Sequence, residues 1–589
     1  MKKVFFPLLM LLLCINISAQ TIDVKWSDQF IYDNKQDGFF DEFIGSNSNY
    51  IYGKFSNLAL MPKKHDKKIK LVAFDKTTMK KVGDAELKGY GNSTDKEDYK
   101  YYKTITLDNL IYVFWTKSEK EVIELYVQSF DLKLKKVNGL KKIYELNRGS
   151  KGNGVDKLII LYNKQINNKI LIAKEFGTTK DNENLKVEYK LLNPDFSFIT
   201  AKQVTLPVMV TKRRRGLFSG SVSFDDNICT YELGNDGNLY IQEMVRASDE
   251  EKKSLKKGES SVYPHLMQVQ MESGTIQDYK VKFAQKNTFN FSSLVTKNGI
   301  KLYGFFSDLT KDEKGYDTHG TFFISLDSKT FKVNETKFAY FEKSFLDQLY
   351  AADKENQKKG KGIFKSDKAK ASDEESIDDN YVIERVIEDG NDILLFCSIM
   401  RNWSRTVCTS NGNGGTTCNT YYYCTKSNVT TFKLNNSGEI LWAKNLDRSI
   451  TYSRWNVYDL NVMKNNSSYY VVYGSSYQMN AQKKNRRSSK SSKQLTDRLE
   501  YAVFSGQTGD FKKSEYQINT VNAKKADKKF VSADNIQVFD NKMYTDCVRT
   551  KIKPLTFLSC LCPPVFYVLF LSGNSRKGTG YIGVIAPLK

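Results

Sequence analysis

Residues 108–115 read DNLIYVFW, a turn-forming pair followed by six apolar or aromatic residues. Asp and Asn favour turns because their side chains hydrogen-bond to the nearby backbone, whereas Ile, Val, Tyr, Phe and Trp favour strands. An apolar run of this kind, without strict alternation, predicts a strand that is buried on both faces. The architecture depends on whether this strand is single or one copy of a repeat.

Similar stretches recur along the whole chain. Each begins with Asn, Asp, Gly or Ser and continues into β-branched and aromatic residues, which is the pattern of a hairpin's second strand. The further copies are SNYIYGKF (48–55), NNKILIAKEF (167–176), DGNLYIQEMV (236–245), NGIKLYGFF (298–306), GNDILLFCSI (390–399), NSSYYVVYG (466–474) and DNKMYTDCV (540–548).

A second pattern, strand then turn then strand, follows each of the first seven copies. The chain therefore repeats a unit of four short strands, with a variable length of roughly 55 to 80 residues. The strand-turn-strand segments are 71–87, 125–140, 189–206, 267–283, 322–338, 430–446 and 501–518.

This repeat resembles a β-propeller. The order of apolar strand, Asp or Asn turn, and strand is similar to that of kelch-like and quinoprotein-like blades. The units repeat neither the Gly-Gly pairs of kelch blades nor the GH…WD signature of WD blades. The resemblance therefore implies a fold and carries over no functional residue.

The number of blades depends on the two ends of the chain. A lone four-stranded sheet is marginally stable, whereas sheets packed face to face around an axis bury both faces. Residues 21–30, TIDVKWSDQF, resemble the fourth strand of a unit, and residues 531–589 supply further strands. We expect an all-β fold of eight four-stranded blades, closed by pairing of the N- and C-terminal strands. Seven blades, or two packed β-sandwiches, are the alternatives.

The N-terminus has the features of a secretory signal. Lys2 and Lys3 precede an apolar run, and Ala19 provides a small residue for cleavage. We expect a signal peptide at 1–19 and a propeller domain at 20–589, exported to the periplasm, the cell surface or the medium. The apolar run 556–571 contains Pro563 and Pro564, which disfavour a membrane helix and favour a buried strand.

Two segments interrupt the strand pattern. Residues 343–378 begin with a candidate amphipathic helix and continue as a charged stretch with few apolar residues. Residues 481–496, AQKKNRRSSKSSKQLT, are rich in Ser, Lys and Arg, which is typical of an exposed loop. Both segments are predicted to be insertions into the propeller.

Export changes the expected role of the cysteines. Eight of the nine remain after Cys14 is removed with the signal. In an oxidising compartment cysteines tend to form disulfides. Cys408 and Cys418 flank TSNGNGGTT, so a hairpin there would bring them together as a candidate disulfide. A metal site is the alternative, but the sequence has no CxxC pair.

The formal charge of +23, or +21 without Lys2 and Lys3, favours contact with anionic surfaces. Two basic clusters supply candidate contact residues, although they are equally compatible with separate solvated loops. The candidates are Lys212, Arg213, Arg214, Arg215, Lys483, Lys484, Arg486 and Arg487.

Catalytic motifs are absent from the sequence. The three histidines, His65, His265 and His319, belong to no HExxH or triad pattern, and we expect each to be structural. Four acids, Asp75, Asp131, Asp195 and Asp327, occupy equivalent turns in their units, which favours a role in the turn over catalysis.

These observations predict a secreted, non-catalytic binding or scaffold propeller for a protein or an anionic glycan. A carbohydrate-active hydrolase or lyase with carboxylates at the central funnel is one alternative. A cell-envelope assembly component is another. We expect no cofactor, no metal, no nucleic-acid partner and no membrane span, and a monomeric chain.

Overall fold

The computed structural model confirms an all-β chain. It describes residues 22–33, 39–56, 69–87, 99–107, 109–119, 122–147, 157–166, 168–176, 183–210, 230–296, 299–311, 317–358, 377, 381–411, 415–453, 460–473, 495–496, 498–519, 529, 531–532, 536–552 and 576–588. The predicted signal at 1–19 and the apolar run 556–571 lie outside these ranges.

Eight antiparallel sheets, each with a path of four strands, form the blades of a β-propeller. The prediction of eight blades is therefore confirmed, and the alternative of seven is wrong. The chain divides into two compact units. The first comprises Met1–Leu58, Lys68–Val82 and Tyr458–Lys589, and the second Ala59–Lys67 and Gly83–Val457.

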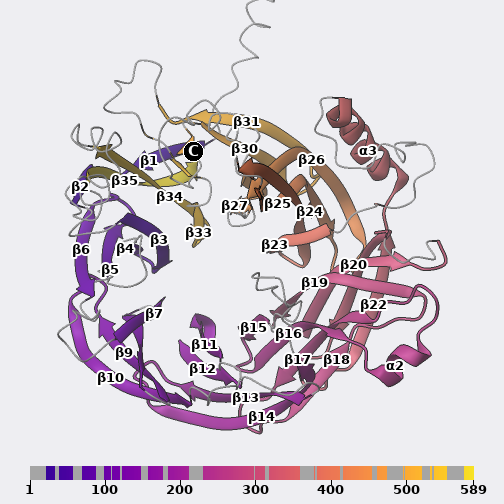
Figure 1. Ribbon diagram of the computed structural model, residues 1–589, viewed down its shortest axis with the longest axis horizontal. Coiled ribbons are helices and arrows are strands. Elements are labelled where there is room, and N and C mark those ends of the chain that lie inside the picture. Colours follow the sequence, from indigo (N-terminus) through magenta and orange to yellow (C-terminus); the bar gives the residue numbers. More distant parts are fainter. Residues whose placement is uncertain are drawn as a thin grey trace, which may run out of the picture. The chain divides into compact units, whose positions relative to one another are not determined.

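The second unit contains five sheets. In Figure 1 they follow one another along an arc, with the first strand of each sheet on the inner side. Their strands are β7(Tyr99–Thr106), β8(Ile111–Ser118), β9(Val122–Phe130), β10(Lys136–Asn147), β11(Lys157–Asn163), β12(Lys169–Glu175), β13(Glu183–Leu192), β14(Phe198–Val210), β15(Thr230–Leu233), β16(Leu239–Arg246), β17(Val262–Val269), β18(Ile276–Lys280), β19(Lys286–Thr296), β20(Gly299–Asp308), β21(Gly320–Leu326), β22(Val333–Tyr340), β23(Tyr381–Asp389), β24(Asp392–Asn411), β25(Gly415–Leu434) and β26(Ile440–Ser453).

The first unit contains the other three sheets and a short two-stranded pair, β29(Leu495–Thr496) with β32(Val531–Ser532). The sheet strands are β1(Ile22–Trp26), β2(Phe30–Asp33), β3(Phe39–Ser46), β4(Tyr50–Ser56), β5(Ile69–Asp75), β6(Lys81–Leu87), β27(Asn461–Asn465), β28(Ser468–Tyr473), β30(Arg498–Ser505), β31(Phe511–Gln517), β33(Gln537–Phe539), β34(Lys542–Ile552) and β35(Arg576–Pro587). Strand β6 continues past Val82 into the residues of the second unit.

The N- and C-terminal strands share one sheet, as predicted. Strand β1 pairs antiparallel with β35, from Ile22 opposite Pro587 to Trp26 opposite Gly583. A side chain at Gly583 would put its Cβ 2.9 Å from the Trp26 ring, so the indole packs where only glycine leaves room. The two ends of the chain thus complete a single blade.

The stretch that opened the sequence analysis is a second strand, β8. Every residue from Ile111 to Trp115 is at most 3% exposed, so both faces of the strand are buried. Apolar clusters join neighbouring sheets: one combines Val187 and Leu206 of the β11–β14 sheet with Leu239 and Ile241 of the next. The core of the second unit therefore lies between its blades.

The predicted role of the four turn acids is confirmed. Each carboxylate accepts backbone N–H groups within its own turn; Asp75 Oδ1, for example, accepts from Thr77 at 3.0 Å and Thr78 at 2.7 Å. The other three carboxylates accept in the same way: Asp131 from Lys133 N–H, Asp195 from Ser197 N–H, and Asp327 from the N–H groups of Lys329 and Thr330.

Helices are few among the described residues. Helix α3(Lys343–Lys358) confirms the helix predicted at the start of the 343–378 insertion, and it buries Phe345 and Leu349 in an apolar cluster with Phe432 of β25. Helix α2(Asp249–Ser254) and the 3-10 turn η1(Lys164–Ile166) were not predicted. No described helix is long and apolar enough to span a membrane.

Candidate functional site

The first strands of the second unit form the candidate site, because they line the inner side of its arc (Figure 1). Neighbouring first strands are linked by hydrogen bonds from side chains to backbone carbonyls. Lys103 Nζ on β7 donates to the carbonyl of Ile160 on β11 at 2.7 Å, and Asn163 Nδ2 on β11 donates to that of Leu233 on β15 at 2.8 Å. These bonds hold the strands as one continuous surface.

Strand β7 has the most distinctive sequence on this surface, YKYYK at 99–103. Lys100 and Tyr102 are exposed, Tyr102 by 37%. The Tyr102 hydroxyl donates to the carbonyl of Leu158 on β11, which orients the ring along the surface. Tyr101 packs edge-on against the buried Trp115, with ring centroids 6.3 Å apart. Lysine and tyrosine therefore make up this whole segment of the strand.

Several groups on these strands remain accessible to solvent and are nevertheless desolvated by surrounding protein. Desolvation raises the pKa of Tyr102 and lowers the pKa of Lys103. It also raises the pKa of Tyr162 on β11 and of Glu232 on β15, although Glu232 is exposed. Accessible groups with such shifts are expected on a concave surface, and they often mark functional sites.

Backbone bulges shape three of these first strands. Tyr102 is the extra residue of a bulge between Tyr101 and Lys103, and Glu384 that of a bulge between Ile383 and Arg385. Strand β19 is irregular between Phe289 and Ser292. A bulge redirects side chains relative to the regular strand, and bulges are common next to functional sites.

Glu384 organises a buried ionic network in the β23–β26 sheet. Its carboxylate lies 3.2 Å from Lys426 Nζ and 3.3 Å from Arg448 Nη2, and it accepts the hydroxyl of Ser398. Desolvation opposes ionisation, but the charges of Arg448 and Lys426 outweigh it and hold the pKa of Glu384 below its usual value. The glutamate is thus an ionised structural anchor, unlike Glu232.

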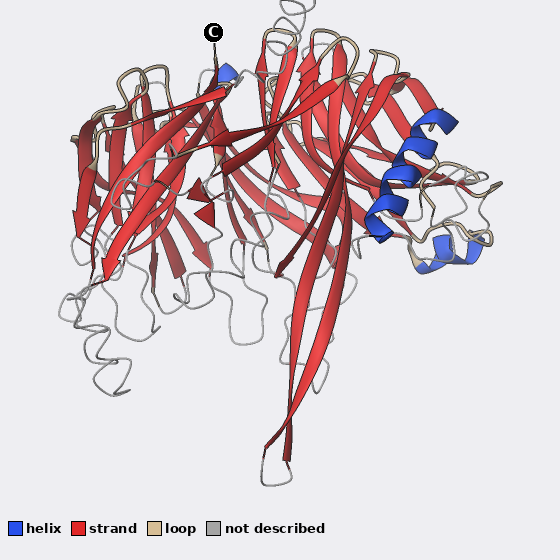
Figure 2. Ribbon diagram, turned by 90° about the horizontal axis from the view of Figure 1, so that it is seen from above, coloured by secondary structure: helices blue, strands red, loops and turns tan. Residues whose placement is uncertain are grey.

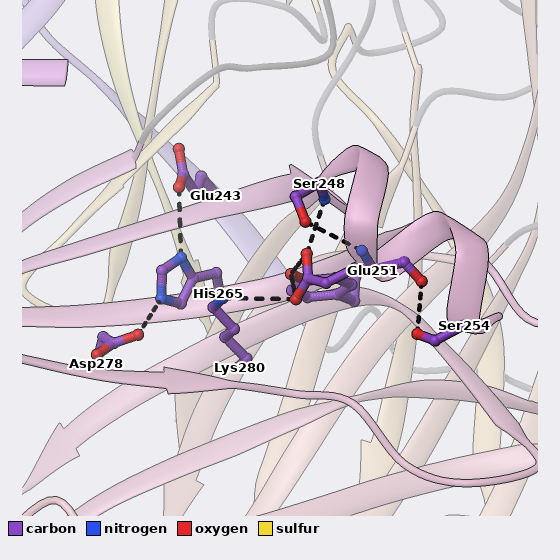
Figure 3. Close-up of polar contacts among 8 residues, drawn as sticks. Glu243, Ser248, Glu251, Ser254, His265, Asp278 and Lys280 are labelled. Atoms are coloured by element: carbon purple, nitrogen blue, oxygen red, sulfur yellow. Dashed lines mark hydrogen bonds and ion pairs between the residues drawn. The ribbon is translucent and has the colours of Figure 1, made fainter. Parts of the chain in front are cut away.

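His265 lies on β17 between two carboxylates (Figure 3). Its Nδ1 is 3.5 Å from Glu243 Oε1 and its Nε2 is 2.9 Å from Asp278 Oδ2. Next to it, Glu251 of α2 lies 3.8 Å from Lys280 Nζ and completes the capping box with Ser248. His265 is completely buried, so the cluster ties strands β16, β17 and β18 together.

His319 is also buried, and its Nδ1 accepts the backbone N–H of Asp308 at 3.2 Å. The contacts of His265 and His319 therefore support the predicted structural roles, whereas His65 lies outside the described residues. Within the described part of the chain, no group of three or more His, Cys, Asp and Glu side chains could hold a metal ion.

The basic residues selected from the sequence are not among those that the structure describes. These are Lys212, Arg213, Arg214, Arg215, Lys483, Lys484, Arg486 and Arg487. Conversely, the sequence analysis missed the site on β7. The YKYYK segment itself was a usable signal, since lysines and tyrosines on a first strand point to a binding surface rather than to core packing.

The backbone places Cys408 directly opposite Cys418 in the β24–β25 hairpin. Asn402, not another cysteine, lies opposite Cys424. Directly opposed residues of an antiparallel pair have Cα atoms about 4.5–5.5 Å apart, within the range that a disulfide spans. The predicted bridge thus agrees with the register. Cys397 is buried, forms no disulfide among the described residues, and burial raises the pKa of its thiol.

Comparisons with known proteins find similar solved structures but assign the chain to no family. No family model matches the chain, and no curated protein matches it. Among solved structures, polysaccharide lyase Uly1 is 11% identical, with a TM-score of 0.32 and coverage of 95% of this chain and 99% of that chain.

Two further propeller structures score similarly. The WD40 domain of SCAP from fission yeast is 7% identical, with a TM-score of 0.33 and coverage of 96% and 98% of the two chains. The β-propeller domain of the Trilobed protease from Pyrococcus furiosus is 10% identical, with a TM-score of 0.33 and coverage of 84% and 98%. Similarities at this level assign no function.

Substitution Glu384→Gln tests the buried network. Removing one partner of a buried ion pair leaves the other charges uncompensated, so we expect a loss of about 3–5 kcal/mol at pH 7. Because the folded pKa of Glu384 is lowered, its contribution is present above about pH 4.3 and is lost as the pH falls through the folded pKa. Denaturant unfolding should show the same difference from wild type at pH 7 and pH 5 and a smaller one at about pH 3, whereas exposed Glu335→Gln should match wild type throughout.

Peptide mapping without reduction tests the disulfide. Protein purified from an oxidising compartment should give a linked peptide pair containing Cys408 and Cys418, because these residues are register partners. Buried Cys397 should be alkylated only after denaturation. A link from either residue to Cys424, or complete alkylation of both thiols in the native protein, would contradict this pairing.

Proposed function

We propose that the protein is a non-catalytic binding propeller that recognises an acidic polysaccharide through the first strands of its second unit. One observation carries the proposal: β7, a strand on the inner side of the arc (Figure 1), is rich in lysine and tyrosine, and its Lys100 and Tyr102 are exposed. The exposed tyrosine offers a flat apolar face for a sugar ring, and the ammonium group of Lys100 offers a charge for a uronate or sulfate.

The overall charge and the N-terminal sequence support this proposal. A chain with a formal charge of +23 attracts polyanions from a distance and increases their rate of encounter. The signal-like residues 1–19 agree with export, and acidic polysaccharides are abundant outside the cell. We therefore propose that the protein acts at the cell surface, in the periplasm or in the medium, including as a component of envelope assembly.

The double variant Lys100→Gln/Tyr102→Ala tests this site. Losing one charge contact and one stacking ring should weaken the affinity for polygalacturonate about tenfold, which corresponds to about 1.4 kcal/mol. Titration calorimetry at two salt concentrations should also show a smaller salt dependence for the variant. The control Lys135→Gln/Lys136→Gln removes two exposed charges. Lys136 is the first residue of the outer strand β10 and Lys135 directly precedes it, so the affinity should change less than about twofold.

Equal loss of affinity in the variant and the control would mean that binding follows net charge alone. The β7 site would then be discarded. Absence of binding by the wild-type protein to any polyuronate or sulfated polysaccharide would remove the proposed function itself.

A second candidate function is a carbohydrate-active hydrolase or lyase, and one observation favours it. Glu232 is an exposed carboxyl on a first strand whose pKa is raised by desolvation, the property required of a general acid. In contrast, Glu384, on another first strand, is ionised and held between Lys426 and Arg448. Glu384 therefore cannot supply the second acid that glycoside hydrolysis requires, which ranks catalysis second.

Glu232→Gln separates these two functions. If the protein is an enzyme, this isosteric change should reduce polysaccharide cleavage at least about a hundredfold while leaving the affinity nearly intact. Reducing-end release would detect hydrolysis, and the ultraviolet absorbance of an unsaturated uronate product would detect elimination. If wild-type protein binds the polymer without cleaving it, the enzyme hypothesis is rejected.

A further inference from the structure

The hairpin β24–β25 extends well beyond its own blade. Both strands have 20 residues, but β23 accompanies β24 only as far as Tyr381 opposite Ile399. From Met400 to Asn411, β24 pairs with β25 alone among the described strands, and β26 follows β25 as far as Ser453 opposite Tyr423. Figure 2 shows this ribbon projecting away from the sheets. We call residues 400–411 and 415–426 the arm.

The arm is long for an unsupported structure. Beyond Tyr423, where the pairing with β26 ends, Ser404–Asn411 pair with β25 alone of the strands described, and these residues at about 3.3 Å each extend about 26 Å. A two-stranded ribbon of this kind is only marginally stable in water, because one layer buries little apolar surface. Two features of the arm offset this weakness: the opposed Cys408 and Cys418 near its end, and continuity with the buried core of the blade at Ile399. A long projection that the chain maintains despite its marginal stability favours a role in contact with a partner.

Charge sets the arm apart from the rest of the chain. The whole chain has 67 acidic residues, yet none lies between Ile393 and Gly438. The same segment carries Arg401 and Arg405 on the arm, whereas Lys426 at its base is buried and paired with Glu384. An acid-free, basic projection is electrostatically complementary to an anionic partner and would repel a basic one.

The strand register sorts the arm residues into two faces. Residues two apart on a strand share a face, together with their cross-strand partners. One face therefore carries two arginines and three aromatic residues: Arg401 opposite Thr425, Trp403 opposite Tyr423, and Arg405 opposite Tyr421. We call it the arginine-aromatic face. The opposite face carries Asn402, Ser404, Thr406 and Cys408, opposite Cys424, Tyr422, Thr420 and Cys418.

The arginine-aromatic face has the chemistry of a glycan contact. Guanidinium groups form paired hydrogen bonds with carboxylates and sulfates, and Trp and Tyr provide flat, rigid surfaces for sugar rings. Arg401, Trp403 and Arg405 occupy successive positions of one face along the strand. A linear acidic polymer lying along the ribbon would meet positive charge, aromatic ring and positive charge in turn.

We propose that the arm is a second contact surface for an acidic polysaccharide, used together with the first-strand site of the same unit. This inference rests on the proposed function, since it assigns the same class of ligand to a second surface. Two sites on one polymer raise the overall affinity because binding at one increases the local concentration at the other. A long chain should therefore use both surfaces, and a short oligosaccharide only one.

The variant Arg401→Gln/Arg405→Gln tests the arm. We expect its affinity for polygalacturonate to fall about tenfold, from the loss of two charge-assisted contacts. Its affinity for a tetragalacturonide, too short to bridge two surfaces, should change less than about twofold. Two controls should retain polymer affinity: Ser404→Ala/Thr406→Ala on the opposite face, and Lys135→Gln/Lys136→Gln, which removes the same number of charges elsewhere.

The possible outcomes distinguish the two proposals. If wild type binds no polyanion, the proposed function fails and the arm inference with it. If Lys100→Gln/Tyr102→Ala weakens polymer binding but the arm variant binds as wild type, only the arm inference is overturned. Cross-linking of the arm to an envelope protein, with polymer affinity unchanged in the arm variant, would also overturn it in favour of a protein partner.

Discussion

The structure depends on one constraint: each blade has two apolar faces and cannot bury either by itself. Strand β8 shows this directly, because five consecutive side chains from Ile111 to Trp115 are buried. In the second unit, apolar clusters combine residues of adjacent sheets, so each blade is stabilised by its neighbour. The candidate binding surfaces accordingly lie outside these clusters, on the first strands and on the arm.

The sequence predicted those features that depend on residues close together in the chain or on a recognisable strand pattern. A turn acid followed by a strand is a short-range pattern, and the bonds of Asp75 to Thr77 and Thr78 match it. The pairing of β1 with β35 was predictable because residues 21–30 resemble a fourth strand that lacks a blade. The eight blades follow from these two kinds of signal.

The candidate site was harder to predict, because it depends on bulges and on contacts between blades. No local pattern marks Tyr102 or Glu384 as the extra residue of a bulge. The ionic network of Glu384 joins residues that are up to 64 positions apart, so spacing could not reveal it. The length of the arm was missed as well: the sequence predicted a hairpin at Cys408 and Cys418, but not that β24 runs without interruption from Asp392 to Asn411.

Two tyrosines show how a polar ring is accommodated in the core: Tyr52 and Tyr240 are completely buried. Their hydroxyls bond to turn residues a few positions earlier: Tyr52 accepts from Asn47 at 2.7 Å, and Tyr240 donates to Asp236 at 2.7 Å. Turn formers therefore serve twice, by bending the chain and by satisfying the polar end of the following ring.

The union of β1 with β35 has a consequence for biosynthesis. Residues 583–587 are synthesised long after their partners at 22–26, so this sheet cannot assemble until β35 has been made. Contacts that are so distant in sequence also form slowly. Until then β1 lacks its partner, so this blade cannot contribute to the stability of a partly synthesised chain.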